Sequence, residues 1–297
     1  MSLRFHTLDV FTDQPYGGNP LAVVFGGDAL ETRQMQRIAR EFNLSETVFV
    51  LPPTRGDALH RVRIFTPAAE LPFAGHPTIG TACLLAELGL VPKGSDAAFV
   101  LEEGIGPVAI SLRRTPGEPV YAELTTAQPP EYGAPPDIDA LARVLGLQAD
   151  ELCSGDERPR AVSCGMPFVL VPLRAPELLA AIDFDASEAR RVLGAAWARQ
   201  LYVYARGYEG ELRARMFATG LGIGEDPATG AAAAALAGAL GSESRDEGLL
   251  QWTIHQGVEM GRPSRLYIRA ERVGGVLTAV RVGGHSVLMS DGLLGAV

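Results

Sequence analysis

Two uncharged segments constrain most strongly how this chain can fold. Residues 73–80 (Phe-Ala-Gly-His-Pro-Thr-Ile-Gly) lead into the uncharged run 81–86, and residues 224–230 (Gly-Glu-Asp-Pro-Ala-Thr-Gly) lead into the uncharged run 231–240. Because both runs are apolar on all sides, each predicts a helix that is buried throughout rather than laid on a surface. At about 10 residues each, the two helices are too short to cross a membrane.

The prolines of these segments predict where the two helices begin. Proline is favoured at the first helical position, where its missing N–H would have had no partner. Aligning Pro77 with Pro227 therefore places His76 and Asp226 at the two N-caps or directly before them. The N-terminus of a helix carries partial positive charge and unpaired N–H groups. Two such ends facing one cleft would hold a small carboxylate, in contact with His76 and Asp226.

The composition is that of a globular protein and excludes several partners. The chain has 297 residues, of which 47% are hydrophobic and 21% charged, and its formal net charge is −9. This acidic balance argues against nucleic acid and anionic membranes as partners. Three cysteines without a Cys-x-x-Cys pair fit a reducing compartment. The first residues lack the apolar core of a signal peptide, so we expect a cytoplasmic protein. The histidines show no metal-ligand spacing, and no metal or cofactor site is predicted.

The two halves of the chain repeat the same order of elements, which predicts a duplication. The matched pairs are strands 18–24 and 165–171, helices 31–42 and 187–193, strands 45–51 and 201–204, and strands 61–65 and 213–217. A proline-rich linker at 125–136 separates the halves and predicts lobes at 1–126 and 127–297, with the strands from about 280 returning to the first lobe.

The fold class that follows is α+β, with two pseudo-symmetric lobes. A buried helix must be covered on every face, and each half supplies several strands but one further good helix. We therefore expect a curved, mostly antiparallel sheet wrapped round each central helix, with the two lobes facing each other across a cleft.

The repeat is broken where one half carries a carboxylate. Ser45 and Glu46 open a strand whose counterpart in the second half begins near Gln200. A lone Glu near two helix N-termini is a candidate general acid or base if burial raises its pKa. A symmetric scaffold with asymmetric acid and base groups suits the movement of a proton from one carbon to another.

These segments together resemble the phenazine-biosynthesis PhzF-like family, within the wider diaminopimelate-epimerase-like fold. The resemblance covers essentially the whole chain. Its motifs are Gly18-Asn-Pro, Ser45-Glu-Thr-Val-Phe, the stretch 65–80, Glu225-Asp-Pro-Ala-Thr-Gly and Gln256-Gly-Val-Glu-Met-Gly-Arg-Pro-Ser. The resemblance implies two lobes with one central helix each, a homodimer, and a cofactor-free isomerase that shuttles a proton within a small carboxylic acid.

The resemblance also implies roles for individual residues. Glu46 matches the acid/base of the family, and His76 and Asp226 match residues that line the site. Backbone amides at Gly75 and Gly230 would approach the substrate. Two further positions, Asn19 and Ser45, are candidate substrate contacts.

One position departs from the family pattern. Ala231 stands where the family commonly has serine, so a hydroxyl that could hold the substrate is missing. Members of the wider fold that racemise or epimerise carry a cysteine at each helix tip, and His76 and Asp226 in those places argue against a two-cysteine mechanism.

Other interpretations of the same residues remain. The protein could be an epimerase or racemase of a small amino acid, or a carboxylate-binding protein without turnover. Glu46 could be a solvated carboxylate at a strand end, His76 and Asp226 could serve only as helix caps, and Asn19 could hydrogen-bond its own turn.

Overall fold

The computed structural model describes residues 2–207, 210–218 and 224–295 and has the predicted α+β fold. Its contacts divide the chain into two compact units. The first unit comprises Met1–Ala127 and Val282–Val297, and the second comprises Gln128–Arg281. Within the described ranges, no helix has the length and apolarity that a membrane span requires.

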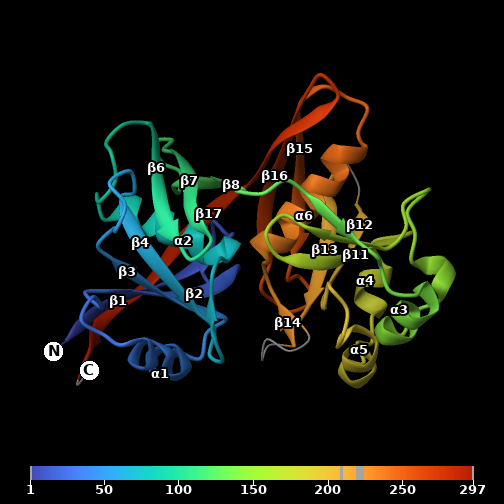
Figure 1. Ribbon diagram of the computed structural model, residues 1–297, viewed down its shortest axis with the longest axis horizontal. Helices are drawn as coiled ribbons and strands as arrows, with labels where there is room; N and C mark the ends of the chain where they lie inside the picture. The colour runs from blue at the N-terminus through green and yellow to red at the C-terminus, as the bar shows by residue number, and fades with distance from the viewer. Residues whose placement is uncertain (1, 208–209, 219–223, 296–297) are drawn as a thin grey trace. The chain divides into compact units, whose positions relative to one another are not determined.

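In the first unit, eight strands close into a ring around one helix (Figure 1). Their order around the ring is β1, β2, β3, β4, β6, β7, β8 and β17, and β17 pairs with β1 to close it. The bounds are β1 (Leu3–Val10), β2 (Asn19–Phe25), β3 (Glu46–Leu51), β4 (His60–Phe65), β5 (Glu70–Leu71), β6 (Asp96–Glu103), β7 (Gly106–Arg113), β8 (Tyr121–Thr125) and β17 (Val276–Leu294).

The helix inside this ring is α2 (Gly75–Glu87). It packs against β1, β2, β3, β7 and β8, and every residue from Gly75 to Ala86 is buried. A second helix, α1 (Thr32–Phe42), lies outside the ring and packs on β3 and β4 with its buried face of Met35 and Ala39. The prediction of a helix that is buried on all sides is confirmed.

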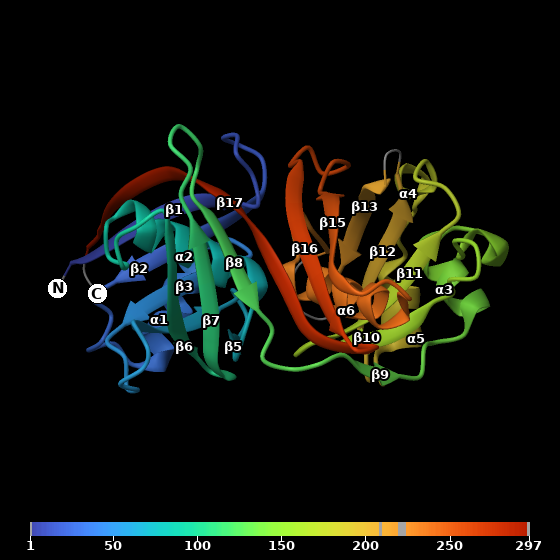
Figure 2. The ribbon, with the colours of Figure 1, turned by 90° about the horizontal axis from the view of Figure 1, so that it is seen from above.

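The second unit wraps strands round its own central helix, α6 (Gly230–Glu243), as Figure 2 shows. This helix packs against β10, β11, β15 and β16, and all of its residues from Gly230 to Gly241 are buried. The strands are β9 (Glu131–Gly133), β10 (Arg160–Ser163), β11 (Pro167–Leu173), β12 (Gln200–Arg206), β13 (Leu212–Phe217), β14 (Glu225–Asp226), β15 (Gly248–Gln256) and β16 (Ser264–Val273). Outside them lie α3 (Ile138–Leu145), the 3₁₀ turn η1 (Ala149–Glu151), α4 (Leu178–Ala181) and α5 (Ala186–Leu193). In the part of the chain that the structure describes, the second half therefore has three α-helices outside its sheet, where we predicted one.

The strand pairings confirm the duplication. In each unit an antiparallel pair (β1–β2, β10–β11) is followed by a parallel one (β2–β3, β11–β12). An antiparallel pair follows (β3–β4, β12–β13), and then a second parallel pair (β4–β6, β13–β15) whose crossover contains the central helix. Parallel strands need such a crossover.

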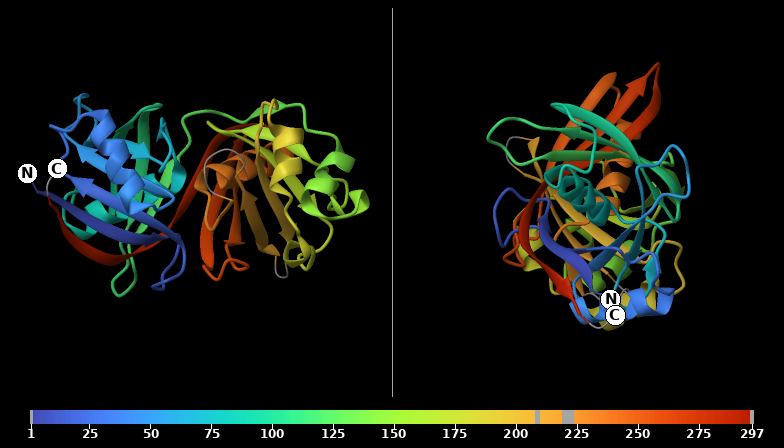
Figure 3. Two further views of the ribbon diagram at one scale, coloured as in Figure 1. Left: turned by 90° about the horizontal axis from the view of Figure 1, so that it is seen from below. Right: turned by 90° about the vertical axis from the view of Figure 1, so that its left-hand side faces the viewer.

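The chain ends meet in the first unit. Leu3 pairs with Leu294 across β1 and β17, and Figure 3 shows the two termini side by side. The predicted linker at 125–136 contains β9, which pairs with β10 in the second unit as β17 pairs with β1 in the first.

The two central helices begin at different residues from those predicted. The N-cap of α2 is Ala74 and the N-cap of α6 is Thr229, so Gly75 and Gly230 are the equivalent first residues. His76 is therefore the second residue of α2, and the prediction that it caps the helix is wrong. Pro77 fits at the third position because N–H groups in the first turn have no intrahelical partner.

The prediction for Asp226 is also wrong. Asp226 ends the short strand β14, four residues before α6 begins. The residue before a proline is disfavoured in helical conformation, and the extended conformation of Asp226 in β14 agrees with this preference, although His76 before Pro77 is helical. Asp226 is equivalent to Leu71 of β5, since Asp226 pairs with Met216 as Leu71 pairs with Ile64.

Candidate active site

Three predicted site residues lie together in the first unit. Asn19 opens β2, Glu46 opens β3, and His76 lies in the first turn of α2. His76 Nδ1 lies 3.3 Å from Glu46 Oε2 and 3.3 Å from Asn19 Nδ2. We call these residues the Glu46–His76 half-site. Glu46 is only 8% exposed, so it is not a solvated strand-end carboxylate.

The imidazole of His76 is neutral. Burial lowers the pKa of His76 to about 3, and the opposing effect of a hydrogen bond to the Pro20 backbone is smaller. One ring nitrogen therefore carries a proton and the other is an acceptor. If Nδ1 carries the proton, it can donate to the Glu46 carboxylate. If it does not, it can accept from the Asn19 amide.

The other predicted residues of this unit flank the half-site in the chain. Ser45 directly precedes β3 and is partly exposed, and Gly75 is the buried first residue of α2. Asn19 reaches His76, 57 residues further along the chain, so its role is not confined to its own turn.

In the second unit, Asp226 belongs to a buried network of hydrogen bonds. Asp226 Oδ2 accepts from Thr229 Oγ1 at 2.6 Å, and the Asp226 carbonyl accepts from Gln256 Nε2 at 2.8 Å. Gln256 Oε1 in turn accepts from Tyr202 Oη at 3.1 Å and from Thr229 N at 3.2 Å. Burial raises the pKa of Tyr202, so its hydroxyl remains a donor. Gln256 is fully buried, and its hydrogen bonds to Asp226 and Thr229 hold the loop between β14 and α6.

The start of α6 carries the remaining predicted residues. Gly230 and Ala231 are its first two residues and both are buried. Because Gly75 and Gly230 are equivalent, Ala231 takes the place that His76 has in the first unit. The methyl group of Ala231 offers no hydrogen bond, so the second unit has no polar side chain there.

Strand register shows where the duplication has diverged. Glu46 pairs with Leu21 across β2 and β3, and Gln200 pairs with Phe168 across β11 and β12. Leu21 and Phe168 are equivalent because each follows a Gly-x-Pro sequence by one residue. Gln200 is therefore the counterpart of Glu46, as the sequence predicted, and an amide stands in the second half where the first has a carboxylate.

Sequence reasoning missed two side chains that contact Asp226. Gln256 was visible as part of the Gln-Gly-Val-Glu motif, but nothing in its spacing showed that it would reach the start of α6. Thr229 follows Asp226 closely, and an incorrect helix start concealed its role as N-cap.

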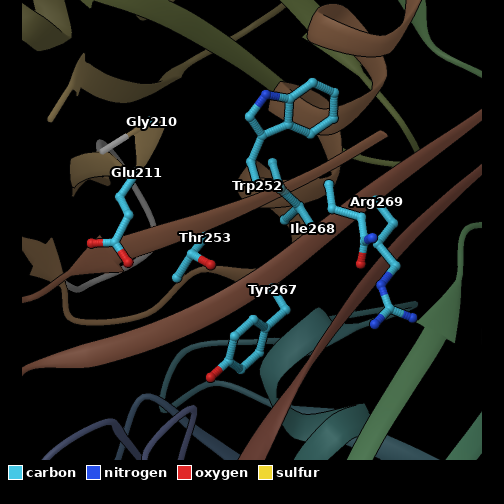
Figure 4. A pocket seen from close by; sticks show the side chains of 8 residues that line it. Gly210, Glu211, Trp252, Thr253, Tyr267, Ile268 and Arg269 are labelled. Atoms are coloured by element: carbon cyan, nitrogen blue, oxygen red, sulfur yellow. The ribbon is translucent and has the colours of Figure 1, made fainter. Parts of the chain in front are cut away.

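A surface hollow lies elsewhere in the second unit (Figure 4). It measures about 320 Å³, and Figure 4 shows Glu211 and Arg269 at opposite ends of it. Its lining residues are Gly210, Glu211, Gln251, Trp252, Thr253, Tyr267, Ile268 and Arg269. No predicted site residue is among them. The described part of the chain also contains no cluster of three or more His, Cys, Asp or Glu side chains that could hold a metal ion.

A family model and several curated relatives match almost the whole chain. A family model described as phenazine biosynthesis-like protein (PhzC-PhzF) matches residues 8–292. An uncharacterized isomerase of Mesorhizobium japonicum is 44% identical, with 96% of each chain covered. The trans-2,3-dihydro-3-hydroxyanthranilate isomerase of Pseudomonas aeruginosa is 38% identical, with 97% of this chain and 98% of that protein covered.

Solved structures show the same fold. A PhzF-family phenazine biosynthesis protein of Bacillus anthracis has a TM-score of 0.88 at 24% identity, with 99% of each chain covered. A hydroxyproline epimerase of Agrobacterium vitis has a TM-score of 0.68 at 14% identity, with 99% of this chain and 92% of that chain covered. Both likenesses concern the fold alone.

The chain thus has a duplicated α+β fold with one buried helix in each unit, which is the fold of epimerase-like isomerases. The chain belongs to the phenazine biosynthesis-like (PhzC-PhzF) family. The prediction that the protein is a PhzF-like isomerase is confirmed.

Proposed function

We propose that this protein is a cofactor-independent isomerase that moves a proton within a small carboxylic acid, with Glu46 as the acid/base. The observation that carries the proposal is one buried carboxylate, 3.3 Å from a neutral imidazole, with an amide at the equivalent position of the other half. A group that must accept a proton from one carbon and return it to another has to be ionisable, and Gln200 is not.

The neutral His76 supports this role in both charge states of Glu46. When Glu46 is ionised, a His76 ring with its proton on Nδ1 can donate to the carboxylate, whose Oε2 lies 3.3 Å away. When Glu46 holds the transferred proton, its carboxyl group keeps an acceptor oxygen, so Nδ1–H can still donate to it in the same tautomer. The half-site can therefore follow the proton without a charge forming on the imidazole, which its burial disfavours.

The two helix starts provide the groups that hold the substrate in this proposal. N–H groups in the first turn of α2 and α6 bind the substrate carboxylate and stabilise the negative charge that develops during proton removal. Gly75 and Gly230 permit close approach because neither has a side chain. Asp226, whose carboxylate already accepts from Thr229, contributes a polar contact from the second unit.

The names of the relatives suggest where to look for the substrate. Relatives at 38% identity act on trans-2,3-dihydro-3-hydroxyanthranilate, a small cyclic amino acid with a hydroxyl group. We propose a substrate of the same class that makes no hydrogen bond to a side chain at the Ala231 position. The protein is proposed to act in the cytoplasm as a homodimer.

Proton NMR in D₂O tests the proposal. The protein is mixed with trans-2,3-dihydro-3-hydroxyanthranilate and with a panel of small unsaturated and amino carboxylic acids, and Glu46→Gln is run beside the wild type. We expect a new isomer or deuterium at carbon with the wild type only. An α-epimer would favour the epimerase alternative. A tight ligand that binds without any exchange would instead indicate a binding protein.

A further inference from the structure

The duplication contains a second pair in which the first half has a carboxyl group and the second an amide. Arg61 of β4 lies beside Glu102 of β6, and the equivalent Arg213 of β13 lies beside His255 of β15. The next residues along these strands, Glu103 and Gln256, are therefore equivalent. Gln256 is the residue that holds the start of α6.

Glu103 also contacts the start of its unit's central helix, at the fourth residue of α2 instead of at the N-cap. Its Oε1 lies 2.6 Å from Oγ1 of Thr78, in the first turn of the helix. Glu103 and Gln256 are each followed by a glycine that packs on a proline. A Cβ atom on Gly104 would lie 2.8 Å from Pro72 Cα, and one on Gly257 would lie 2.6 Å from the carbonyl oxygen of Pro227. Glu103 and Gly104 thus contact Thr78 and Pro72, and Gly75 and His76 lie between these two contacts in the chain.

The two oxygen contacts of the Thr78 hydroxyl favour a proton on Glu103. The hydroxyl of Thr78 has one hydrogen but contacts two oxygen atoms, the Ala74 carbonyl at 2.7 Å and Glu103 Oε1 at 2.6 Å. A carbonyl has no hydrogen to give, so the Ala74 contact is a hydrogen bond only if Thr78 donates to it. The contact with Glu103 is then a hydrogen bond only if the carboxyl group donates to Thr78.

The surroundings of Glu103 agree with a neutral group. Glu103 is 5% exposed, and its Oε2 is buried with no hydrogen-bond partner among the described residues. An ionised carboxylate in such a place would be costly. Burial raises the pKa of Glu103 to about 8.

Among the residues that the structure describes, the neighbouring charged groups do not account for this state. On β4, Arg61 and Arg63 alternate with the buried Val62 and Ile64 and so point out of the ring, and Arg63 pairs with Glu70 of β5. Glu102 accepts from Thr54 and Arg55, and Arg113 of β7 stacks over Tyr121. On α2, burial keeps His76 neutral, and it raises the pKa of Cys83 to about 12.

We propose that Glu103 is a positioning residue for the Glu46–His76 half-site: as a carboxylic acid it donates to Thr78 and fixes the first turn of α2, as Gln256 fixes the start of α6. Loss of its proton removes the donor, leaves a buried negative charge beneath that turn, and displaces Gly75 and His76. The role in positioning rests on the function proposed above, whereas the coupling of Glu103 to the helix start does not.

The first test is a pH titration of the isotopically labelled protein by NMR, without substrate. The wild-type amide signals of Gly75 and His76 should shift in one step with a midpoint near pH 8. Glu103→Gln, which copies the second half, should remove this step and keep the signals at their low-pH positions. Glu102→Gln, which changes the adjacent carboxylate on the outer side of β6, should leave the step in place.

Two results would overturn the inference. One is a wild-type protein without a step between pH 6 and 10, and the other is a step that persists in Glu103→Gln. Thermal unfolding provides a check that does not depend on signal assignment. A carboxyl group whose folded pKa exceeds its unfolded value makes the protein lose stability as the pH rises from the unfolded toward the folded pKa. The wild-type Tm should therefore fall between about pH 5 and 8 relative to that of Glu103→Gln.

Turnover separates this inference from the proposed function. With an identified substrate, Glu103→Gln should keep kcat within about twofold at pH 7 and lose the alkaline limb near pH 8, while Glu103→Leu should lower kcat about tenfold or more with a smaller change in KM. If the NMR step is found and removed as expected but no substrate is turned over, the proposed function fails and the coupling stands. If Glu103→Gln keeps the alkaline limb of wild type, the positioning role is wrong.

Discussion

The two units of this protein have the same strand pairings but different polar side chains at equivalent positions. The first has Glu46, His76 and Glu103 where the second has Gln200, Ala231 and Gln256. Each ionisable or proton-carrying group of the first unit is thus replaced by an amide or a methyl group. The strand pairings of the duplicated fold have been kept at these positions, while the three side chains that can carry or exchange a proton are found in the first unit.

The second unit has kept a different polar group. Asp226 has the apolar Leu71 as its counterpart, and its surroundings consist of hydrogen-bond donors from Thr229 and Gln256. This half is built to hold a fixed arrangement. In the function that we propose, only the first unit transfers the proton.

Copying the second half into the first should have the largest effect. Glu46→Gln gives the first unit the amide of Gln200, and we expect kcat to fall by about 10²–10⁴-fold because a general acid/base is lost. Steady-state kinetics and ligand titration measure this, and ligand affinity should be retained. A variant that keeps more than a tenth of the wild-type kcat would show that Glu46 is not the acid/base.

The titration of His76 gives the next effect. Because burial holds the folded pKa of His76 near 3, the unfolded chain binds more protons at pH 4.5 than the folded protein does, and stability falls as the pH drops below about 6.5. His76→Gln removes this contribution. Urea unfolding at pH 7 and 4.5 should show a loss of stability that is smaller in the variant by about 2–3 kcal/mol.

The control for this experiment is His255→Gln, which changes a partly exposed histidine paired with Glu211. An equal loss of stability in wild type and His76→Gln would mean that His76 is not held neutral by burial.

The hydrogen bonds of Gln256 near Asp226 can be removed without changing the first unit. Gln256→Ala leaves the Thr229 N–H and the Asp226 carbonyl without their side-chain partner, and we expect the protein to lose about 1–2 kcal/mol of stability. Chemical denaturation measures this loss, and Gln251→Ala, at an exposed position of the same strand, serves as the control. A loss no larger than that of the control would show that Gln256 does not hold the start of α6.

Tyr202→Phe should have the smallest effect. It removes one hydrogen bond to Gln256 Oε1, which still accepts from Thr229, so a loss of about 1 kcal/mol or less is expected. The same unfolding measurement applies. A loss larger than that of Gln256→Ala would reverse the order of importance that we assign within the network.

Much of the fold was predictable because its cause is local in the sequence. Uncharged runs at 81–86 and 231–240 had to be buried, and the matching order of strands showed the duplication. The proximity of Asn19, Glu46 and His76 followed less directly, since it depended on the family resemblance rather than on spacing.

The start of each helix was not predictable from its proline. Pro77 occupies the third helical position and Pro227 precedes α6, so one sequence pattern has two structural outcomes. The equivalence of Glu103 and Gln256 depends on the register between β4 and β6 and between β13 and β15. Strands far apart in the sequence set that register, and no local pattern reports it.

The central claim is that the first unit alone transfers the proton, and deuterium incorporation tests it most directly. Wild type, Glu46→Gln and Gln200→Leu are compared in D₂O with a substrate that the wild type converts, and deuterium at carbon is followed by NMR. We predict that incorporation is abolished in Glu46→Gln and retained in Gln200→Leu. Undiminished incorporation by Glu46→Gln, or its loss in Gln200→Leu with the fold intact, would contradict the account.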